Sequence, residues 1–206
     1  MTGAGGATGV RFDEVMTGRL ALGETDPRAG YRSPGAVGVV LRGRIRIADV
    51  DAFLEDPAHG AELLGDVDIP VLGGRFESEA GRFGLFVPSG SARLTHMVYQ
   101  SRVVIDGRPH WFHGHKEIRV AGPWRLWPAT TTLLVTLHDG AGQAEDAGPV
   151  IGAGVLRLRP TDFLSLLGSL RATGGATVRR RWSARGRFAA FFAGGLVSTY
   201  LLRRRA

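Results

Sequence analysis

The chain contains no cysteine among its 206 residues. This absence excludes a disulfide framework, a cysteine-ligated zinc or iron–sulfur site and a cysteine nucleophile. An apolar run of about 18 residues or more is also missing, so no transmembrane helix is expected. The N-terminus lacks a charged segment followed by an apolar one, so no secretory signal is expected and the protein is predicted to be cytoplasmic.

Lysine is scarce, and acidic residues are absent from the end of the chain. Lys116 is the only lysine, and Asp162 is the last acidic residue. The formal net charge is +7, but the nine arginines after Asp162 contribute +9, which leaves −2 for residues 1–162. A basic chain suggests a nucleic-acid binder. Since the body is nearly neutral and the basic end has no recognisable reading motif or aromatic platform, we expect no nucleic-acid partner.

Apolar and polar residues alternate with a period of two, which predicts half-buried β-strands. One face of a first strand carries Phe12, Met16, Leu20 and Leu22, and one face of a second carries Val39, Leu41, Ile45 and Ile47. Asp49 is a predicted N-cap for a short helix through Leu54, and Asp106-Gly107 predicts a tight hairpin turn. Further strands are expected near 62–72, 74–79, 82–88, 93–105, 108–120, 129–138 and 149–159.

About eight strands joined by short turns predict an all-β fold with C-terminal helices. Closure into an antiparallel, lipocalin-like β-barrel is favoured because an open sheet would leave exposed edges, while a β-sandwich remains the alternative. A barrel of this size holds side chains or one small ligand. We expect a disordered N-terminus over 1–9, the barrel over 10–160, and a helical extension packed on it over 161–206.

The C-terminal extension is predicted to contain two helices. The first runs from Thr161 or Asp162 to about Arg171, a linker follows at 173–175, and the second runs from Ser183 or Arg185 to about Leu202. The apolar stretch of the second helix has arginines on both sides, as interfacial helices do. Docking on the barrel and peripheral membrane contact through 185–206 are both left open, as is a homodimer.

Two charged residues fall on strand faces that should be buried. Glu14 lies between Phe12 and Met16, and Lys116 shares a face with Phe112. A lone buried charge is costly, so we expect a Glu14–Lys116 ion pair inside the barrel. Tyr99 and Ser101 also point inward and are predicted to hydrogen-bond to this pair. The pair either fixes strand register or acts on a ligand, because burial shifts the pKa of ionisable groups toward useful values.

No metal or cofactor is expected. His113 and His115 share a strand face at a spacing that metals use, but that face also carries Trp111, Glu117 and Arg119 and is typical of a solvent-facing surface. The neighbouring His110 points the other way, and His59 and His138 lie near turns with no evident partner. The glycines of 3–9 follow no strand and precede no Gly-Lys-Ser/Thr sequence, so a nucleotide site is not expected.

Ten short motifs occur in a characteristic order between about 10 and 200. They are Phe12-x-Glu14-x-Met16-x-Gly18, Asp56-Pro57-x-His59, Gly73-Gly74, Gly81-x-Phe83-x-Leu85-Phe86, Met97-x-Tyr99, Gly114-x-Lys116, Trp127-x-x-Thr130-Thr131-Thr132-Leu133, Gly154-x-Leu156-Arg157, Asp162-Phe163 and Phe188-x-x-Phe191-Phe192-x-Gly194. In that order they resemble the accessory domain joined to cholesterol-oxidase-like flavoenzymes of the glucose–methanol–choline class in actinobacteria. The resemblance implies affinity for sterol-like or other large apolar molecules, without flavin chemistry, since the flavin-binding part is missing.

The chain also resembles, in general character, the small β-barrel cyclases of bacterial polyketide pathways. That resemblance implies a cofactor-independent cyclisation or isomerisation, driven by folding the substrate into a reactive conformation. Lys116 and Tyr99 would donate hydrogen bonds to a substrate carbonyl, and Glu14 would orient Lys116. The other expected ligand contacts are Phe112, Met16, Met97, Ser101, Trp124 and Trp127. The alternative is a non-catalytic lipid- or sterol-binding protein that serves a separate oxidoreductase.

Overall fold

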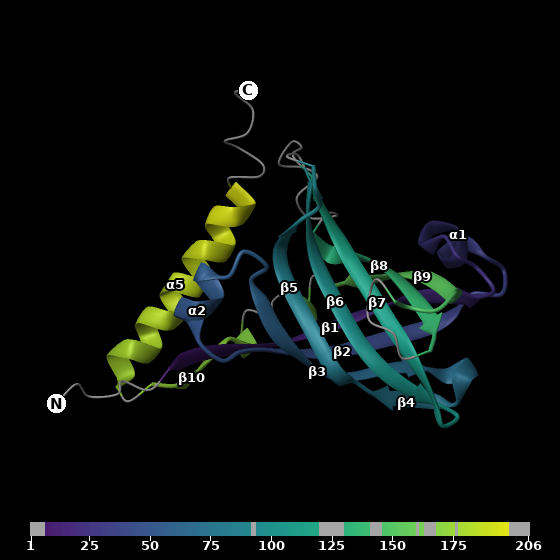
Figure 1. The fold of residues 1–206 in the computed structure, drawn as a ribbon, viewed down its shortest axis with the longest axis horizontal. Helices are drawn as coiled ribbons and strands as arrows, with labels where there is room; N and C mark the ends of the chain where they lie inside the picture. The colour runs from purple at the N-terminus through teal and green to yellow at the C-terminus, as the bar shows by residue number, and fades with distance from the viewer. Residues whose placement is uncertain are drawn as a thin grey trace.

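A computed structural model describes residues 7–91, 94–119, 130–140, 146–159, 161–162, 168–175 and 177–197. Its strands form one antiparallel sheet that curls into a barrel (Figure 1). The strands are β1 (Thr8–Leu22), β2 (Val37–Ile47), β3 (Gly60–Ile69), β4 (Gly74–Glu77), β5 (Glu79–Pro88), β6 (Leu94–Ile105), β7 (Arg108–Arg119), β8 (Thr132–Asp139), β9 (Val150–Leu158) and β10 (Arg171–Gly174).

The sheet closes because β1 pairs with both β2 and β9. The closing register runs from Met16 opposite Leu158 to Leu22 opposite Gly152. Eight strands, β1 to β3 and β5 to β9, therefore make the predicted closed barrel in an up-and-down order, while β4 pairs only with β3. A Cβ atom at Gly154 would lie 2.1 Å from the carbonyl oxygen of Arg19, so this close backbone approach requires glycine.

The core follows the alternation predicted from the sequence. Val39, Leu41, Ile45 and Ile47 of β2 are all buried, and the Asp106-Gly107 turn joins β6 and β7 with both φ angles positive. Leu22 lies on the same face as Leu20, since both side chains approach Gly152, but 43% of Leu22 is exposed. Leu22 is the last residue of β1, where the strand ends.

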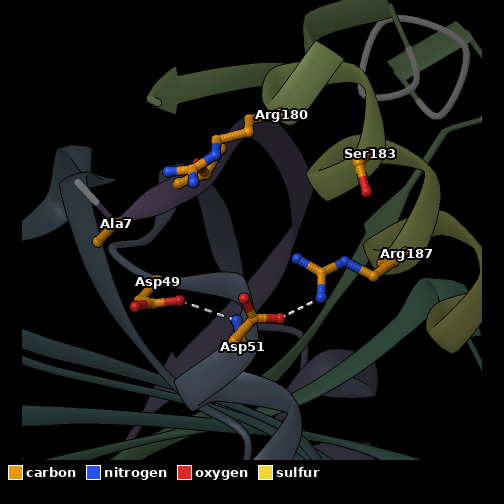
Figure 2. Close-up of a pocket in the computed structure, with 7 residues that line it drawn as sticks. Ala7, Asp49, Asp51, Arg180, Ser183 and Arg187 are labelled. Carbon is orange, nitrogen blue, oxygen red and sulfur yellow. Dashed lines mark hydrogen bonds and ion pairs between the residues drawn. The ribbon is translucent and has the colours of Figure 1, made fainter. Parts of the chain in front are cut away.

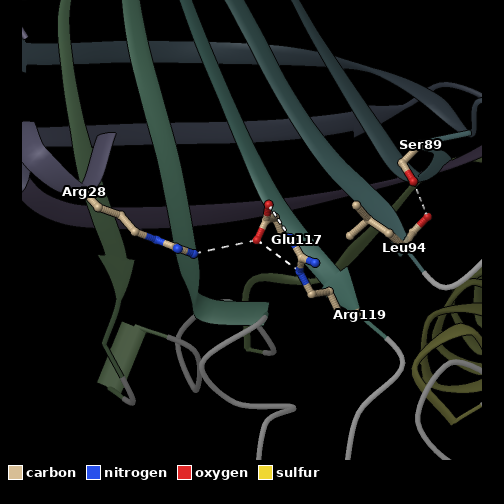
Figure 3. A network of polar contacts seen from close by, with 5 residues as sticks. All are labelled: Arg28, Ser89, Leu94, Glu117 and Arg119. Carbon is tan, nitrogen blue, oxygen red and sulfur yellow. Dashed lines mark hydrogen bonds and ion pairs between the residues drawn. The ribbon is translucent and has the colours of Figure 1, made fainter. Parts of the chain in front are cut away.

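Two short helices fill the connections on either side of β2. The predicted helix is α2 (Val50–Glu55), and Asp49 caps it by accepting a hydrogen bond from the Asp51 backbone N–H. Helix α1 (Pro27–Arg32) was not expected; Asp26 caps it, and Arg28 lies 3.8 Å from Glu117 on β7 (Figure 3). Figure 1 places these two helices at opposite ends of the barrel.

The C-terminal region differs from the prediction at two points. The end of the first expected helix and the linker after it form β10, whose residues Arg171–Gly174 pair with Thr8–Arg11 at the start of β1. Helix α5 (Val178–Val197) begins before the expected start at Ser183. Thr8 and Gly9, expected to be disordered, are ordered in β1 by the same backbone pairing. Residues 198–206, the expected end of α5, lie outside the described residues.

Helix α5 lies beside α2 at one end of the barrel (Figure 1). The Phe188 ring is 5.8 Å from that of Phe12 and 6.0 Å from that of Phe53. Arg187 of α5 forms an ion pair with Asp51 of α2 beside a polar pocket of about 340 Å³ (Figure 2). Helix α5 therefore packs aromatic side chains against the barrel, and an ion pair connects it to α2.

Candidate functional site

Three polar side chains from distant parts of the chain meet inside the barrel. Lys116 of β7 donates a hydrogen bond from Nζ to Oε1 of Glu14 on β1, at 2.5 Å. The hydroxyl of Tyr99 on β6 donates to the other carboxylate oxygen, Oε2, at 2.8 Å. The predicted ion pair is thus present, and Tyr99 completes what we call the polar trio: Glu14, Tyr99 and Lys116.

The polar trio is enclosed by apolar side chains. Glu14 is 4% exposed, and Tyr99 and Lys116 are 2% exposed. Burial raises the pKa of the Tyr99 hydroxyl well above its ordinary value, and the negative charge and hydrogen bond of Glu14 raise it further. Tyr99 is therefore a neutral donor at physiological pH, and its proton is directed at Glu14.

Lys116 keeps hydrogen-bonding capacity that its neighbours do not use. An ammonium group has three N–H donors, and among the described residues Nζ donates to one acceptor, Glu14 Oε1. The Tyr99 ring also faces it, with its centroid 4.9 Å from Nζ. Because they belong to a cation, the remaining N–H groups would be strong donors to a carbonyl oxygen in this largely apolar interior.

Ser101 lies one step along β6 from Tyr99 on the same face. Ser101 is fully buried, and its Oγ atom has no hydrogen-bond partner among the described residues. The prediction that Ser101 hydrogen-bonds to the ion pair is therefore wrong. The cross-strand register explains this, because Ser101 lies opposite Phe112, whereas Lys116 lies opposite Met97. An unpartnered buried hydroxyl is costly, and it adds a second unused polar group to the barrel interior.

The expected ligand contacts divide into two groups. Met16, Met97 and Phe112 are buried in the core, at 1%, 3% and 0% exposure. Trp124 and Trp127 lie outside the described residues. Since the side chains around the polar trio leave almost no accessible surface, the interior is filled in this conformation. A ligand must displace side chains to reach Lys116.

Aromatic rings form a path from the polar trio to the end of the barrel under α5. The Tyr99 ring contacts Phe83 at 5.1 Å between centroids, and Phe83 contacts Phe12 at 6.3 Å. Phe12 in turn meets Phe188 of α5. Phe86 on β5 has a positive φ of 55°, an uncommon backbone conformation, and its ring packs against Phe191 and Phe192. This path was not predictable from the sequence, because its rings come from β1, β5, β6 and α5 and alternation along one strand does not show which rings meet.

The outer face of β6 and β7 differs from the predicted solvent-facing surface. Trp111 is 1% exposed although it lies outside the barrel core, and His113 and His115 are half-buried. Burial first, and then the charges of His115, His138 and His96, lower the pKa of His113 to about 4. The alternation predicted the correct face but not its burial.

The other histidines are also partnered. His59 packs its ring 4.6 Å from that of Phe191, and His138 contacts the carbonyl oxygen of Gly148 through Nδ1. Within the described residues, no three His, Asp or Glu side chains are grouped so as to hold a metal ion.

A second hollow lies on the outside of the barrel. It is a groove of about 690 Å³ over β3, β5 and β6, and its lining includes Ala61, Gly84, Val98, Gln100 and His113. Its volume is within the range of small-molecule sites. None of the polar trio lines it, but Phe83, whose ring contacts that of Tyr99, does, so the groove adjoins the barrel interior.

Comparisons with protein-family models, with curated proteins and with solved structures find no match to this chain. Its class is therefore defined by the fold and by the polar trio: a closed eight-stranded antiparallel barrel with an ion pair inside. In the described ranges, no helix is both long and apolar enough to cross a membrane.

Proposed function

We propose that the protein binds one large apolar molecule, polyketide-like or sterol-like, that carries a carbonyl group. The carbonyl oxygen accepts a hydrogen bond from Lys116, and the hydrocarbon part replaces apolar side chains of the interior. The observation that carries this proposal is the fully buried Lys116, which has N–H groups free of any described partner. The carbonyl oxygen of such a ligand would accept a hydrogen bond from one of them.

The same arrangement supports a cofactor-independent ring closure or isomerisation as the reaction. A hydrogen bond from Lys116 withdraws electron density from a conjugated carbonyl, and the barrel holds the flexible chain in a reactive conformation. In a cycloaddition all atoms of the substrate are kept, so no acid, base or redox group is consumed. Glu14 holds the Lys116 ammonium in place, and Tyr99 holds Glu14. Tyr99 is thus a positioning residue rather than the second carbonyl donor.

The ligand enters under α5 in this proposal. The rings of Phe12, Phe83 and Phe188 connect that end of the barrel to the polar trio, so a movement of α5 would open an apolar route. The structure describes no other aromatic chain of contacts that reaches Tyr99. Binding should therefore be slow compared with diffusion, because α5 must leave its packing first.

A sterol enone with a carbon-13 label at its carbonyl tests the binding. Its infrared stretch should move to lower frequency in the protein, as a hydrogen bond from a cation requires. The variant Glu14→Gln/Lys116→Met should abolish the shift. It removes both charges together, so neither is left buried without its partner. Val98→Arg, which fills the outer groove, should leave the shift intact. A shift that survives Glu14→Gln/Lys116→Met, or that Val98→Arg removes, would overturn the assignment.

Catalysis is tested separately with a linear trienone that closes to a bicyclic ketone of the same mass. An enzyme accelerates the closure, and Tyr99→Phe slows it more than it weakens binding. A carrier, the alternative function, returns the trienone unchanged after extraction. Chromatography of the extracted ligand distinguishes the two outcomes.

A further inference from the structure

The N-terminal half of α5 exposes large apolar side chains. Trp182 is 66% exposed and Val178 is 64% exposed, and they lie one helical turn apart. The Trp182 ring lies beneath the guanidinium of Arg185, at 5.2 Å from its centroid. Arg171, Arg181 and Arg185 line a hollow of about 220 Å³ with Val178 and Trp182. We call Arg11, Arg171, Val178, Arg181, Trp182 and Arg185 the Trp182 surface.

The arginines of the Trp182 surface have no carboxylate partners among the described residues. Arg171 of β10 lies directly opposite Arg11 of β1, an arrangement in which like charges repel. Two other arginines on the outer face of the sheet do have carboxylate partners: Arg44 pairs with Asp13, and Arg46 pairs with Glu62. The sequence has no acidic residue after Asp162, so β10 and α5 carry no acidic residue of their own.

The opposite side of α5 is already occupied. Ala184 is fully buried and Phe188 is 6% exposed against the barrel. The expected membrane contact through 185–206 includes Phe188, Phe191 and Phe192, whose rings pack on Phe12, Phe53 and Phe86, while residues 198–206 of that segment lie outside the described residues. Among the described side chains of α5, the large exposed apolar ones are Val178 and Trp182, which lie earlier in the helix beside arginines without carboxylate partners.

We propose that the Trp182 surface docks on an anionic lipid bilayer. Tryptophan is favoured at the boundary between head groups and acyl chains, and Val178 adds aliphatic area beside it. Arginine binds phosphate oxygens with two parallel hydrogen bonds, and an anionic surface removes the repulsion between Arg11 and Arg171. A nucleic acid offers phosphates but no apolar phase for Val178. The docking does not depend on the barrel interior or on the proposed function.

Flotation of the full chain with lipid vesicles tests the proposal. The protein should float with vesicles of equimolar phosphatidylcholine and phosphatidylserine and not with phosphatidylcholine alone. Each arginine contributes about a fivefold gain in partitioning near an anionic surface. Arg181→Glu/Arg185→Glu should therefore weaken partitioning by more than tenfold. Trp182→Ala should also weaken it, and brominated lipids should quench fluorescence in the wild type more than in Trp182→Phe.

Matched controls are available on other parts of the surface. Arg108→Glu reverses an exposed arginine in the β6–β7 hairpin, and Val71→Ala truncates a side chain that is 54% exposed. Both should float like the wild type, and all variants should keep its thermal unfolding midpoint. Equal flotation with both vesicle types would overturn the proposal, as would a loss in Arg108→Glu equal to that in Arg181→Glu/Arg185→Glu. Tighter binding to double-stranded DNA than to vesicles, lost in the same variants, would assign the surface to nucleic acid instead.

Discussion

The ion pair of the polar trio predicts a large thermodynamic coupling between Glu14 and Lys116. Both side chains are nearly inaccessible to water and are 2.5 Å apart, so neither charge has solvent to replace its partner. Removing one member of a buried ion pair lowers the free energy of unfolding by about 3–5 kcal/mol, because the other charge stays buried without its partner. We expect this loss for Lys116→Met and for Glu14→Gln separately.

The double variant decides whether this reasoning is correct. If the two losses were independent, Glu14→Gln/Lys116→Met would lose about 6–10 kcal/mol, which many proteins of this size could not survive. Because the double variant buries no charge, we expect it to lose no more than either single variant, which corresponds to a coupling of about 3–5 kcal/mol. Urea unfolding followed by far-ultraviolet circular dichroism measures the cycle. A coupling below about 1 kcal/mol would mean that the barrel interior is solvated, and the enclosed site would be refuted.

Three further variants test other parts of the structure. In Gly154→Ala the new methyl group meets the carbonyl oxygen of Arg19, so the closing strands β1 and β9 should separate. Amide hydrogen exchange in β9 should then become faster. An unchanged exchange rate would contradict the close approach of β1 and β9. Phe188→Ala should cost about 3–5 kcal/mol and selectively increase exchange in α5, whereas a loss spread evenly over the barrel would contradict local docking. The His113 pKa of about 4 lies below its unfolded value, so the unfolded state takes up the proton first as pH falls. The free energy of unfolding of the wild type should therefore fall by about 2 kcal/mol between pH 7 and pH 5 because of His113, and that of His113→Gln should fall by less. Equal falls in both proteins would contradict the burial of His113.

The strand faces were predictable because most inward residues are apolar and a buried charge needs a partner. Glu14, Tyr99 and Lys116 were found in this way, since each interrupts or joins an apolar face of its strand. The burial of Trp111 was not predictable, because alternation identifies the side of a sheet and says nothing of what covers that side. Ser101 could be placed inside the barrel, but its partners depend on strand register, which alternation does not define at the level of single pairs.

The C-terminal differences have a related cause. β10 is a short strand of mixed side chains held by backbone hydrogen bonds to β1, so it has no apolar alternation that would reveal it. Its Thr173-Gly174 sequence is also typical of a linker. Helix α5 begins in a run of arginines, which are good helix formers but carry no apolar periodicity, so its start could not be located from the phenylalanines.

The closure of β1 against β9 also bears on how the chain reaches its folded state. The partners of the polar trio are far apart in sequence: 85 positions separate Tyr99 from Glu14, and 102 separate Lys116 from Glu14. Contacts over such separations form late and slowly, because a long loop must close before they are gained. During synthesis on the ribosome, β1 can pair with β9 only after β9 has been made. The carboxylate of Glu14 is thus synthesised 102 positions before its cation, so the interior site cannot form until β7 has been made.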